Sequence, residues 1–504
     1  MTLATIETFK APLHFSLEGV IGKFTLKESG ILQKIHSVVM VILSAILLVL
    51  TIPLWSIGEI IHLCSKEGKK FFDDSVPLGN AKEYLDPAKT KMLGTGLSTF
   101  QATSDPNFCK GSCVHDALKD PKLGLGKGVD ILTKSGRDTT ITYLKKMNAN
   151  TFRFSVEWAD VNKNGFSKYI EAAKHFHSEG FKLVITLDHW VGNGKVNVFE
   201  DPADEKAFVD YSCNAYRALR PYASTFLTFN EPNVDAAQKY IMGELPPKQV
   251  MNFSAANRLV SLKLSVHEKT YDALARLEKT YTGVKAPGKL SVGISHQAII
   301  MKANSRWNLI ARIVAFILTY IFHRSFMEKL EKMQNKIDFL GVQYYCRPLA
   351  GRNGLKIVDS IATKNEHNPN GWMIEGMRYR FDPQGILPIL KDVYKTIKKP
   401  ILVTEVGCAG PYEDRKARYY KIATKAMRAA QDQGIPLIGA LYWTLFGNLE
   451  WQHGYNPETN FGILSRNIET NEIRKTEGFQ FLSFACQNTL SNHHLKIENS
   501  VSVK

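Results

Sequence analysis

The segment TFRFSVEWADVNKNGFSKYIEAAKHFHSEGFKLVITLDHW, residues 151–190, contains the pattern that decides the fold. It begins with the apolar run TFRFSVEW (151–158) and ends with a second apolar run, KLVITLDHW (182–190). Between them, KYIEAAKHFHSEG (168–180) has the apolar spacing of an amphipathic helix. Two strands joined by a helix in this way are typical of a parallel βαβ unit.

The same alternation continues from about Leu93 to about Phe484, and eight apolar runs in it are predicted strands. The six further runs are MLGTGLS (92–98), TFLTFNE (225–231), LSVGISHQ (290–297), IDFLGVQYY (337–345), ILVTE (401–405) and IGALYWTLF (438–446). Eight parallel strands are what a closed barrel needs. We therefore predict an α/β protein with a (β/α)8 TIM barrel.

Composition excludes several classes of protein. Hydrophobic residues make up 44% of the 504 residues and charged residues 22%, as in ordinary globular proteins. The net charge of +16 comes from Lys and Arg spread along the chain, without an accompanying nucleic-acid-binding motif, so we predict no nucleic-acid partner. Seven scattered cysteines indicate free thiols in a reducing compartment. No ligand cluster suggests a metal, and no motif suggests an organic cofactor.

Residues 37–58, SVVMVILSAILLVLTIPLWSIG, contain no charged side chain. As a helix they would reach about 33 Å, enough to cross a bilayer. We predict a single-pass membrane anchor; a buried helix is the alternative, but it would usually carry more polar residues. Lysines flank the segment on both sides and leave its orientation undecided. The free cysteines favour a cytoplasmic catalytic domain.

The predicted organisation has five parts. They are an N-terminal segment (1–36), a transmembrane helix (37–58), a linker (59–90), the barrel (91–484) and a C-terminal tail (485–504).

Polar and aromatic residues stand at the C-terminal ends of nearly all the predicted strands. They include Gln101, Glu157, Asp188, His189, Asn230, Glu231, His296, Gln297, Gln343, Tyr345 and Glu405. Active sites of such barrels form at this face, and burial does not explain carboxylates there. Cleaving a glycosidic bond with retention of configuration needs two carboxyl groups. The glutamates in TFNEP and LVTEVG supply such a pair.

The chain resembles glycoside hydrolase family 1, the β-glucosidase family, from about Gly94 to about Leu464. The resemblance is carried, in the family's order, by FRFSVEW (152–158), VITLDHW (184–190), TFNEPN (228–233), YIMGELPP (240–247), DFLGVQYY (338–345), ILVTEVG (401–407) and YWTLFGNLEWQHGY (442–455). An ordered set of this kind is far more specific than a single NEP tripeptide.

The resemblance implies a role for each matching residue. Glu231 would be the general acid/base and Glu405 the nucleophile. Arg153 would help to keep Glu405 ionised, Tyr345 would donate a hydrogen bond to it, and Asn230 would bind the sugar 2-hydroxyl. For Arg153 alone, a salt bridge in the barrel core remains an alternative.

Five further residues match family positions that bind the rest of the sugar. Gln101, His189, Glu450 and Trp451 would hold the remaining hydroxyls, and Trp443 would form the aromatic platform under the ring. For both tryptophans, simple core packing is the alternative. No cofactor is implied.

The chain departs from the family pattern at several positions. They are Thr103 with Ser104, Val191, Gln343, Val406 and Gly447, which replace Glu-Gly, an acid, Asn, Asn and Asp. None removes a predicted catalytic carboxylate. Together they indicate a divergent branch with a reshaped aglycone side.

The second apolar stretch, WNLIARIVAFILTYIF (307–322), is too short to span a bilayer with certainty. It is either an outer barrel helix or an interfacial helix, with Trp307, Phe316 and Tyr320 as anchors, that lays the barrel on the bilayer. Since it follows the fifth predicted strand, it would lie near the active-site mouth. That position would suit a glycolipid substrate.

We expect a retaining β-glycosidase that hydrolyses a β-glucoside or β-galactoside, with glycolipids among the candidates and a membrane as its setting. A transglycosidase that moves a sugar between glycolipids shares the same intermediate and stays open. A third alternative is an inactive sugar-binding protein. The presence of both glutamates with Arg153 and Tyr345 argues against it. The oligomeric state is left undecided.

Overall fold

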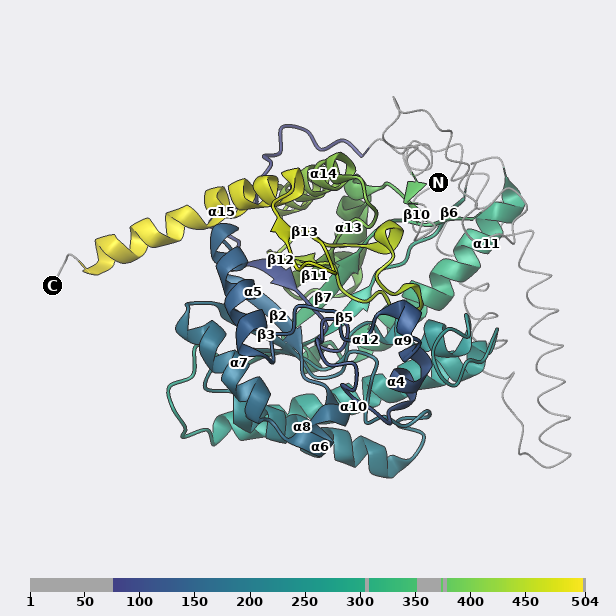
Figure 1. Ribbon diagram of the computed structural model, residues 1–504. Coiled ribbons are helices and arrows are strands. Elements are labelled where there is room, and N and C mark those ends of the chain that lie inside the picture. Colours follow the sequence, from purple (N-terminus) through teal and green to yellow (C-terminus); the bar gives the residue numbers. More distant parts are fainter. Residues whose placement is uncertain (1–75, 304–307, 351–372, 375–378, 502–504) are drawn as a thin grey trace, which may run out of the picture.

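The computed structural model describes residues 76–303, 308–350, 373–374 and 379–501. Eight parallel strands close into a barrel in the order β1-β12-β11-β7-β5-β4-β3-β2 (Figure 1). They are β1 (Met92–Gly96), β2 (Thr151–Ser155), β3 (Lys182–Thr186), β4 (Thr225–Leu227), β5 (Ser291–Gln297), β7 (Phe339–Tyr344), β11 (Ile401–Val406) and β12 (Leu437–Trp443). Each overlaps a run predicted from the sequence, with β11 ending and β12 beginning one residue outside it, so the predicted TIM barrel is confirmed. The predicted anchor at 37–58 lies outside the described residues.

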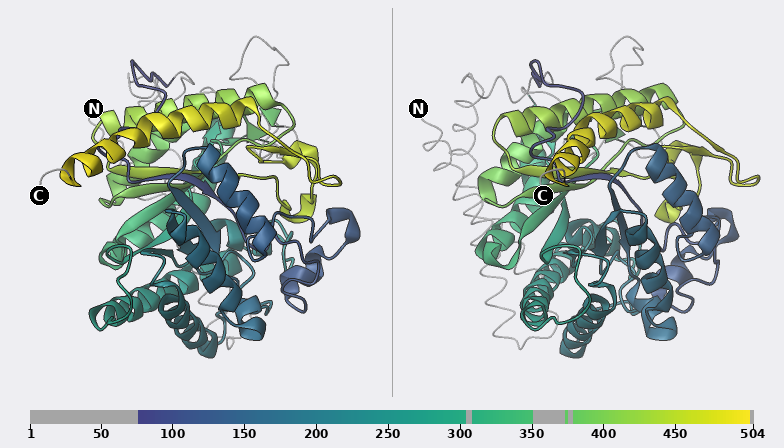
Figure 2. Two further views of the ribbon diagram at one scale, coloured as in Figure 1. Left: turned by 60° about the vertical axis from the view of Figure 1, so that its left-hand side comes forward. Right: turned by 90° about the vertical axis from the view of Figure 1, so that its left-hand side faces the viewer.

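Helices surround this barrel on its outside (Figures 1 and 2). The principal ones are α5 (Lys134–Lys146), α7 (Ser167–Ser178), α8 (Pro202–Leu219), α10 (Phe253–Lys279), α12 (Ser325–Lys332), α13 (Ile386–Thr396) and α14 (Glu413–Asp432). Additional helices are α4 (Cys113–Leu118), α6 (Trp158–Asn164), α9 (Pro232–Tyr240), α11 (Leu309–Thr319) and α15 (Glu477–Val501). Short strand pairs are β6 (Lys302–Ala303) with β8 (Leu349–Ala350), β9 (Met373–Ile374) with β10 (Tyr379–Arg380), and β13 (Ser465–Arg466) with β14 (Ile473–Arg474).

Side chains point alternately inward and outward along each strand, so the core has one part inside the barrel and one between the strands and the helices. On the outside of β2, Phe152 stacks on Phe176 of α7 with ring centroids 4.6 Å apart. Inside the barrel, one apolar layer is formed by Val184, Leu227, Phe339, Leu402 and Leu441. This layer fills the barrel and leaves its C-terminal end for polar side chains.

A glycine permits the closest approach between β1 and β2. A Cβ at Gly94 would lie 1.8 Å from the backbone oxygen of Thr151. Any larger residue would therefore push the first two strands of the barrel apart.

The packed region is wider than the predicted boundaries of 91 and 484. Leu85 is fully buried, and the N–H of Asp86 donates to Gln431 Oε1 at 2.7 Å. At the other end, α15 lies along α14 and crosses position 485, where a tail is predicted (Figure 2). Cys486 and Leu490 are buried because they continue the apolar face of this helix.

The apolar stretch near residue 310 is helical. α11 continues through one wide turn at Tyr320–Arg324 into α12. Within the described residues, Ile310–Lys332 is one helix that is long and apolar enough to cross a membrane, and 39% of its most apolar window is buried. Core helices of soluble proteins meet the same criterion, so this property alone does not make it a membrane span.

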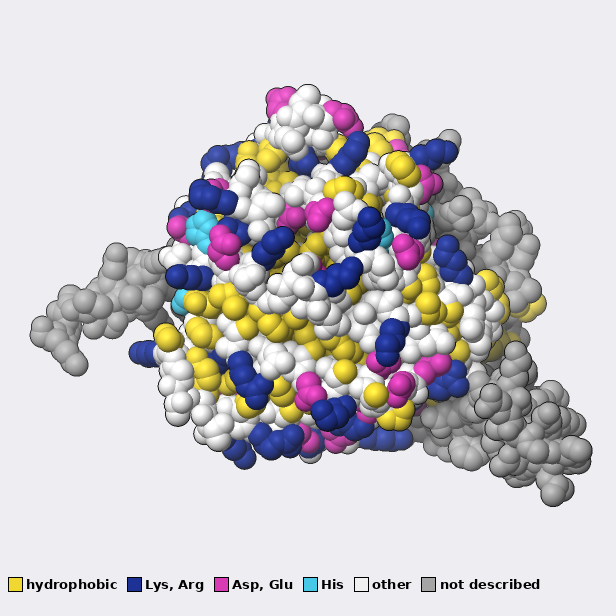
Figure 3. Space-filling model, turned by 60° about the horizontal axis from the view of Figure 1, so that its bottom comes forward, with side chains coloured by type: hydrophobic (Ala, Val, Ile, Leu, Met, Phe, Trp, Pro, Cys, Tyr) yellow, Lys and Arg dark blue, Asp and Glu magenta, His cyan; other side chains and the backbone are white. Residues whose placement is uncertain are grey.

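The basic side chains do not form one continuous stripe on the face shown in Figure 3. Lys and Arg are interspersed there with Asp and Glu, and hydrophobic side chains gather between them. This distribution is that of an ordinary solvated surface.

Candidate active site

The two glutamates in the predicted motifs come from β4 and β11, which are separated by β5 and β7 in the barrel. Glu231 follows β4 at the first position before α9, and its φ of +43° is unusual for a residue with a side chain. Glu405 lies within β11. Each residue is only 4% exposed. Both therefore lie at the C-terminal end of the barrel, where sites of this fold form.

Glu405 is surrounded by hydrogen-bond donors. Arg153 Nη1 donates to Glu405 Oε1 at 2.6 Å, and Gln343 Nε2 donates to the same oxygen at 2.8 Å. Tyr345 OH donates to Oε2 at 2.5 Å. Arg153 is fully buried, and its Nε also donates to Thr186 Oγ1 at 2.9 Å. The predicted positions of Arg153 and Tyr345 beside Glu405 are thus present in the structure.

Asn230 belongs to the same network. Its Oδ1 accepts from Arg153 Nη2 at 2.5 Å and from Gln343 Nε2 at 2.6 Å. Because Gln343 Nε2 contacts both oxygens, Asn230 Oδ1 and Glu405 Oε1 are no farther apart than the two bond lengths together. Glu231 follows Asn230 directly. The segment that carries Glu231 is therefore connected to Glu405 through the shared hydrogen-bond donors Arg153 and Gln343.

Gln343 was predicted to lie at a strand end and was noted as a departure from the family's Asn, but no individual role was predicted for it. It lies two residues before Tyr345, and residues two apart on a strand share a face. That spacing was the available signal that Gln343 reaches the same carboxylate.

The surroundings of the two carboxyl groups act differently on their pKa values. Burial raises the pKa of Glu231 well above its ordinary value, and the nearby charge of Glu405 raises it further. Burial also raises the pKa of Glu405, but Arg153, Tyr345 and Gln343 all oppose that rise. Glu231 Oε1 is buried without a hydrogen-bond partner in the described part of the chain. These surroundings favour a proton on Glu231 over a proton on Glu405.

The predicted sugar-binding residues lie around this pair. Trp443, at the end of β12, stacks on His189 with ring centroids 6.0 Å apart. Trp451 stacks on Trp190 at 4.7 Å. Gln101 Nε2 donates to the backbone oxygen of Leu449 at 2.7 Å, which joins the first strand's loop to the last.

His189 is held as a neutral ring. Burial lowers its pKa well below the ordinary value, and the charges of Arg153 and Lys263 lower it further. Asn230 Nδ2 contacts His189 Nε2 at 3.1 Å, and because the amide nitrogen can only donate, Nε2 accepts. The proton is then on Nδ1, ready to donate to a ligand.

Four buried polar atoms near the mouth have no partner among the described residues. They are Gln101 Oε1, His189 Nδ1, Glu231 Oε1 and Glu450 Oε1. Leaving such atoms unpaired costs about 1–3 kcal/mol each. A ligand with several hydroxyl groups would satisfy them, so their convergence indicates a site for a polyol such as a sugar.

A cluster of four buried charges lies behind Glu231 and was missed by the sequence analysis. Lys263 of α10 forms ion pairs of 2.7 Å with both Asp188 and Asp235. Lys239 pairs with Asp235 at 2.8 Å. Burial alone would lower the pKa of Lys263, but Asp188 and Asp235 raise it above its ordinary value. The cluster connects the end of β3 with α9, whose first residue follows Glu231.

The described segments contain no set of side chains suited to bind a metal ion. No group of three or more His, Cys, Asp or Glu side chains there could hold a metal ion.

Comparisons with known proteins identify the family and the fold of the chain. The sequence model of a family described as glycosyl hydrolase family 1 matches residues 128–488. The galactolipid galactosyltransferase SFR2 of Arabidopsis thaliana is 24% identical over 360 residues, 66% of this chain and 54% of its own length. Beta-glucosidase A of Thermotoga maritima is 23% identical over 70% of this chain and 86% of its own. The chain thus spans about half the length of the plant relative.

Solved structures share the fold. The β-glycosidase of the hyperthermophile Thermosphaera aggregans superposes with a TM-score of 0.65 over 80% of this chain and 96% of its own, at 20% identity. At that identity, the likeness extends to the barrel architecture only.

Proposed function

Since the chain belongs to glycosyl hydrolase family 1, we propose that it is a retaining β-glycosidase with Glu231 as general acid/base and Glu405 as nucleophile. The observation that carries this proposal is the difference between the two carboxyl groups. Glu405 accepts from a buried arginine and two further donors, whereas Glu231 is buried next to a negative charge. One is suited to remain ionised and attack; the other is suited to hold a proton and release it.

In the first step, Glu405 attacks the anomeric carbon while Glu231 gives its proton to the leaving oxygen, and a glycosyl-enzyme ester forms. In the second step, Glu231, now a carboxylate, takes a proton from water. The resulting hydroxide equivalent attacks the anomeric carbon and releases Glu405. Asn230, His189, Gln101 and Glu450 would bind the sugar hydroxyls, with Trp443 and Trp451 beside the ring.

A 2-fluoro aryl β-glycoside tests this proposal. Fluorine at C2 slows both steps by destabilising their oxocarbenium-like transition states, whereas a dinitrophenyl leaving group keeps the first step fast, so the ester should accumulate. We expect peptide mass spectrometry to find the sugar on Glu405, and Glu405→Gln to prevent labelling. Labelling of another side chain, or turnover by Glu405→Gln at the wild-type rate, would refute the assignment.

A second candidate is a transglycosidase, in which a sugar hydroxyl replaces water in the second step. The observation that favours it is the similarity to a plant enzyme named galactolipid galactosyltransferase. Incubating the protein with a galactolipid in ¹⁸O-labelled water separates the two reactions. Hydrolysis places ¹⁸O in the released sugar, whereas transfer yields oligogalactolipid and leaves the label in the solvent.

We also propose that residues 37–58 anchor the protein in a membrane, with the barrel on the cytoplasmic side. The uncharged sequence of this segment supports the anchor, and the free cysteines support the side. The plant relative's name places that protein in the chloroplast. Alkaline extraction of membranes and protease protection of the barrel would test anchor and side separately.

A further inference from the structure

The helix α11 has two apolar faces, although a helix on a barrel surface needs only one. Ala311, Ala315 and Phe322 belong to a small buried cluster, with Leu318 packed against it. Their spacing of three and four residues places them on one side of the helix. This inward face explains how α11 attaches to the molecule.

The other face of α11 is apolar as well. Ile310 is 63% exposed, and Ile313 and Ile317 are partly exposed. These three residues are also three and four positions apart, so they form an outward stripe. Neither Ile313 nor Ile317 belongs to the apolar clusters of the described residues. Core packing therefore does not account for this stripe.

A loop that contacts the cluster under α11 also carries exposed apolar residues. The loop after α9 carries Met242, Val250 and Met251, which are 46%, 67% and 63% exposed. Its first residue, Ile241, packs against the cluster under α11. Met242, Val250, Met251 and Ile310 are four of the eight large hydrophobic residues that are exposed in the described chain. Monomeric soluble proteins rarely gather apolar residues in this way.

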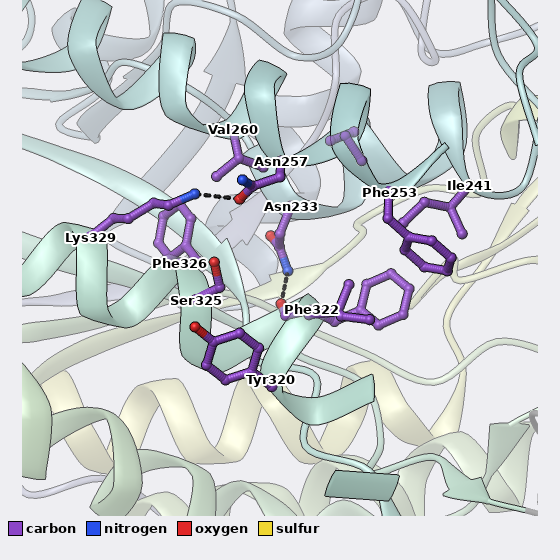
Figure 4. A pocket seen from close by; sticks show the side chains of 13 residues that line it. Asn233, Ile241, Phe253, Asn257, Val260, Tyr320, Phe322, Ser325, Phe326 and Lys329 are labelled. Atoms are coloured by element: carbon purple, nitrogen blue, oxygen red, sulfur yellow. Dashed lines mark hydrogen bonds between the residues drawn. The ribbon is translucent and has the colours of Figure 1, made fainter. Parts of the chain in front are cut away.

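A cavity of about 190 Å³ opens beside this surface between α9, α10 and α12 (Figure 4). Phe253, Phe322 and Phe326 line it, with Asn233 and Lys329 among its polar residues. Asn233 Nδ2 donates to the backbone oxygen of Phe322 at 2.9 Å. Because Asn233 is two residues from Glu231, the cavity connects the apolar side of the molecule with the segment that carries the acid/base.

The distance to the active site is short. α9 begins directly after Glu231 and ends one residue before Ile241. A helix of nine residues is about 14 Å long. The start of the loop that carries Met242 therefore lies within about one short helix of Glu231.

We propose that the outward stripe of α11, together with the Met242–Met251 loop, is a docking surface for a lipid bilayer. Glycolipids held in that bilayer would then present their sugars to Glu231 and Glu405, an inference that rests on the proposed function. We call Ile310, Ile313, Ile317, Met242, Val250 and Met251 the docking surface.

Negative charge is scarce along the outward stripe of α11. From residue 308 to residue 327 the sequence has no Asp or Glu; of its two arginines, Arg312 is buried and Arg324 pairs with Asp392 at 2.6 Å. Lys248 is exposed in the loop. An apolar stripe without acidic side chains can enter the interface of a membrane without burying a negative charge.

The proposed anchor at 37–58 would also tether the barrel to the bilayer. If 37–58 crosses the bilayer, residues 59–75 connect it to the described barrel. Seventeen extended residues reach at most about 60 Å. The barrel would stay next to the bilayer, and the docking surface would set which side faces it.

Contact with lipid can be measured without any enzyme assay. Full-length Ile310→Cys would be labelled with the fluorophore NBD and reconstituted into vesicles that contain phosphatidylglycerol and doxyl-labelled phosphatidylcholine. Val284→Cys is the matched control, because Val284 is 73% exposed in the loop before β5, at the opposite end of the barrel. Background labelling of native cysteines is common to both variants.

We expect the doxyl lipid to quench the label at position 310 at least about threefold more than the label at 284, because interfacial helices insert their apolar face below the headgroups. Equal quenching would overturn the proposal. If the label at position 310 is instead protected from water only when the protein dimerises in detergent, the surface is a contact between two copies, and the docking proposal is wrong.

Activity gives an independent test. We expect Ile310→Glu with Ile317→Glu to lower turnover of a vesicle-bound galactolipid at least about tenfold. Each change places a charge where the proposal has an apolar side chain inserted into the bilayer. Turnover of a soluble aryl β-glycoside should stay within about twofold, and Val284→Glu should change neither. Wild-type turnover of the vesicle lipid by the double variant would contradict docking. A wild-type protein inactive on both substrates but quenched at 310 would refute the proposed function alone.

Discussion

Glu231 and Glu405 have the same side chain and nearly the same burial, yet their partners differ. Glu405 accepts from Arg153, Gln343 and Tyr345, whereas Glu231 lies near the negative charge of Glu405. Identical groups thus obtain different pKa values from their surroundings alone. The roles in the proposed reaction follow from that difference.

Replacing Glu231 should affect substrates unequally. Glu231→Ala removes the proton donor, so we expect kcat/KM for a phenyl β-glucoside to fall about 10²–10⁴-fold. A dinitrophenyl β-glucoside, whose leaving group needs no proton, should lose much less in the step that forms the glycosyl-enzyme. Steady-state kinetics over a series of leaving groups measures this. An equal loss for every leaving group would contradict the role of proton donor.

The basic limb of the pH profile should report Glu231. The group must be protonated to act, so activity is lost as pH rises through its pKa. Burial and Glu405 raise that pKa well above the ordinary 4.5, so the limb should lie well above that value. With a dinitrophenyl leaving group the glycosylation step should lose this limb. A basic limb that is identical for both leaving groups would assign it to another residue.

Gln343 should control the acidic limb, because Glu405 must be ionised to attack. Gln343→Leu removes a donor that lowers the pKa of Glu405, so that pKa should rise. Activity would then be lost at a higher pH as the solution is acidified. The profile of kcat/KM against pH measures the shift, and Gln343→Asn, which keeps an amide donor, should show a smaller one. A Leu variant with an unmoved acidic limb would show that this hydrogen bond does not tune Glu405.

Among the elements, α10 has a role beyond covering the barrel. Its Lys263 reaches Asp188 at the end of β3 and Asp235 on α9. α9 begins directly after Glu231, whose left-handed backbone is held between β4 and this helix. The buried charges therefore fix the angle at which α9 leaves the barrel.

Lys263→Met should destabilise the fold, because it leaves two carboxylates buried with one cation. We expect a loss of about 3–5 kcal/mol in the free energy of unfolding, measured by urea denaturation. Lys269→Met is the matched control on the same helix. Lys269 is 56% exposed and pairs with Glu205, so its replacement should cost less than about 1 kcal/mol. Equal losses of unfolding free energy in both variants would mean that the buried cluster contributes no more to stability than an exposed ion pair.

Elements were easier to predict than contacts across them. All eight barrel strands were found because each is a short apolar run that ends in polar residues. Arg153, Tyr345 and Glu405 were brought together by the resemblance and the topology. Lys263 could not be found, because a lysine on an amphipathic helix usually faces solvent and nothing in its neighbours marks it as buried. The crossing of position 485 by α15 was missed because its apolar face continues past that boundary.

At the scale of the whole molecule, a closed barrel brings strand ends from distant parts of the chain to one mouth. The polar atoms that lack partners there are those a sugar would satisfy. The Met242 end of the proposed docking surface lies within about one short helix of Glu231. An enzyme arranged in this way would act on sugars at the surface of a membrane.

The configuration of the first product tests the central claim most directly. We would follow cleavage of an aryl β-glycoside by ¹H NMR and observe the anomeric proton before mutarotation. Two successive displacements at the anomeric carbon, by Glu405 and then by water or an acceptor, must yield the β-anomer first. Initial release of the α-anomer would contradict the account, because it requires a single displacement and leaves Glu405 no role as nucleophile.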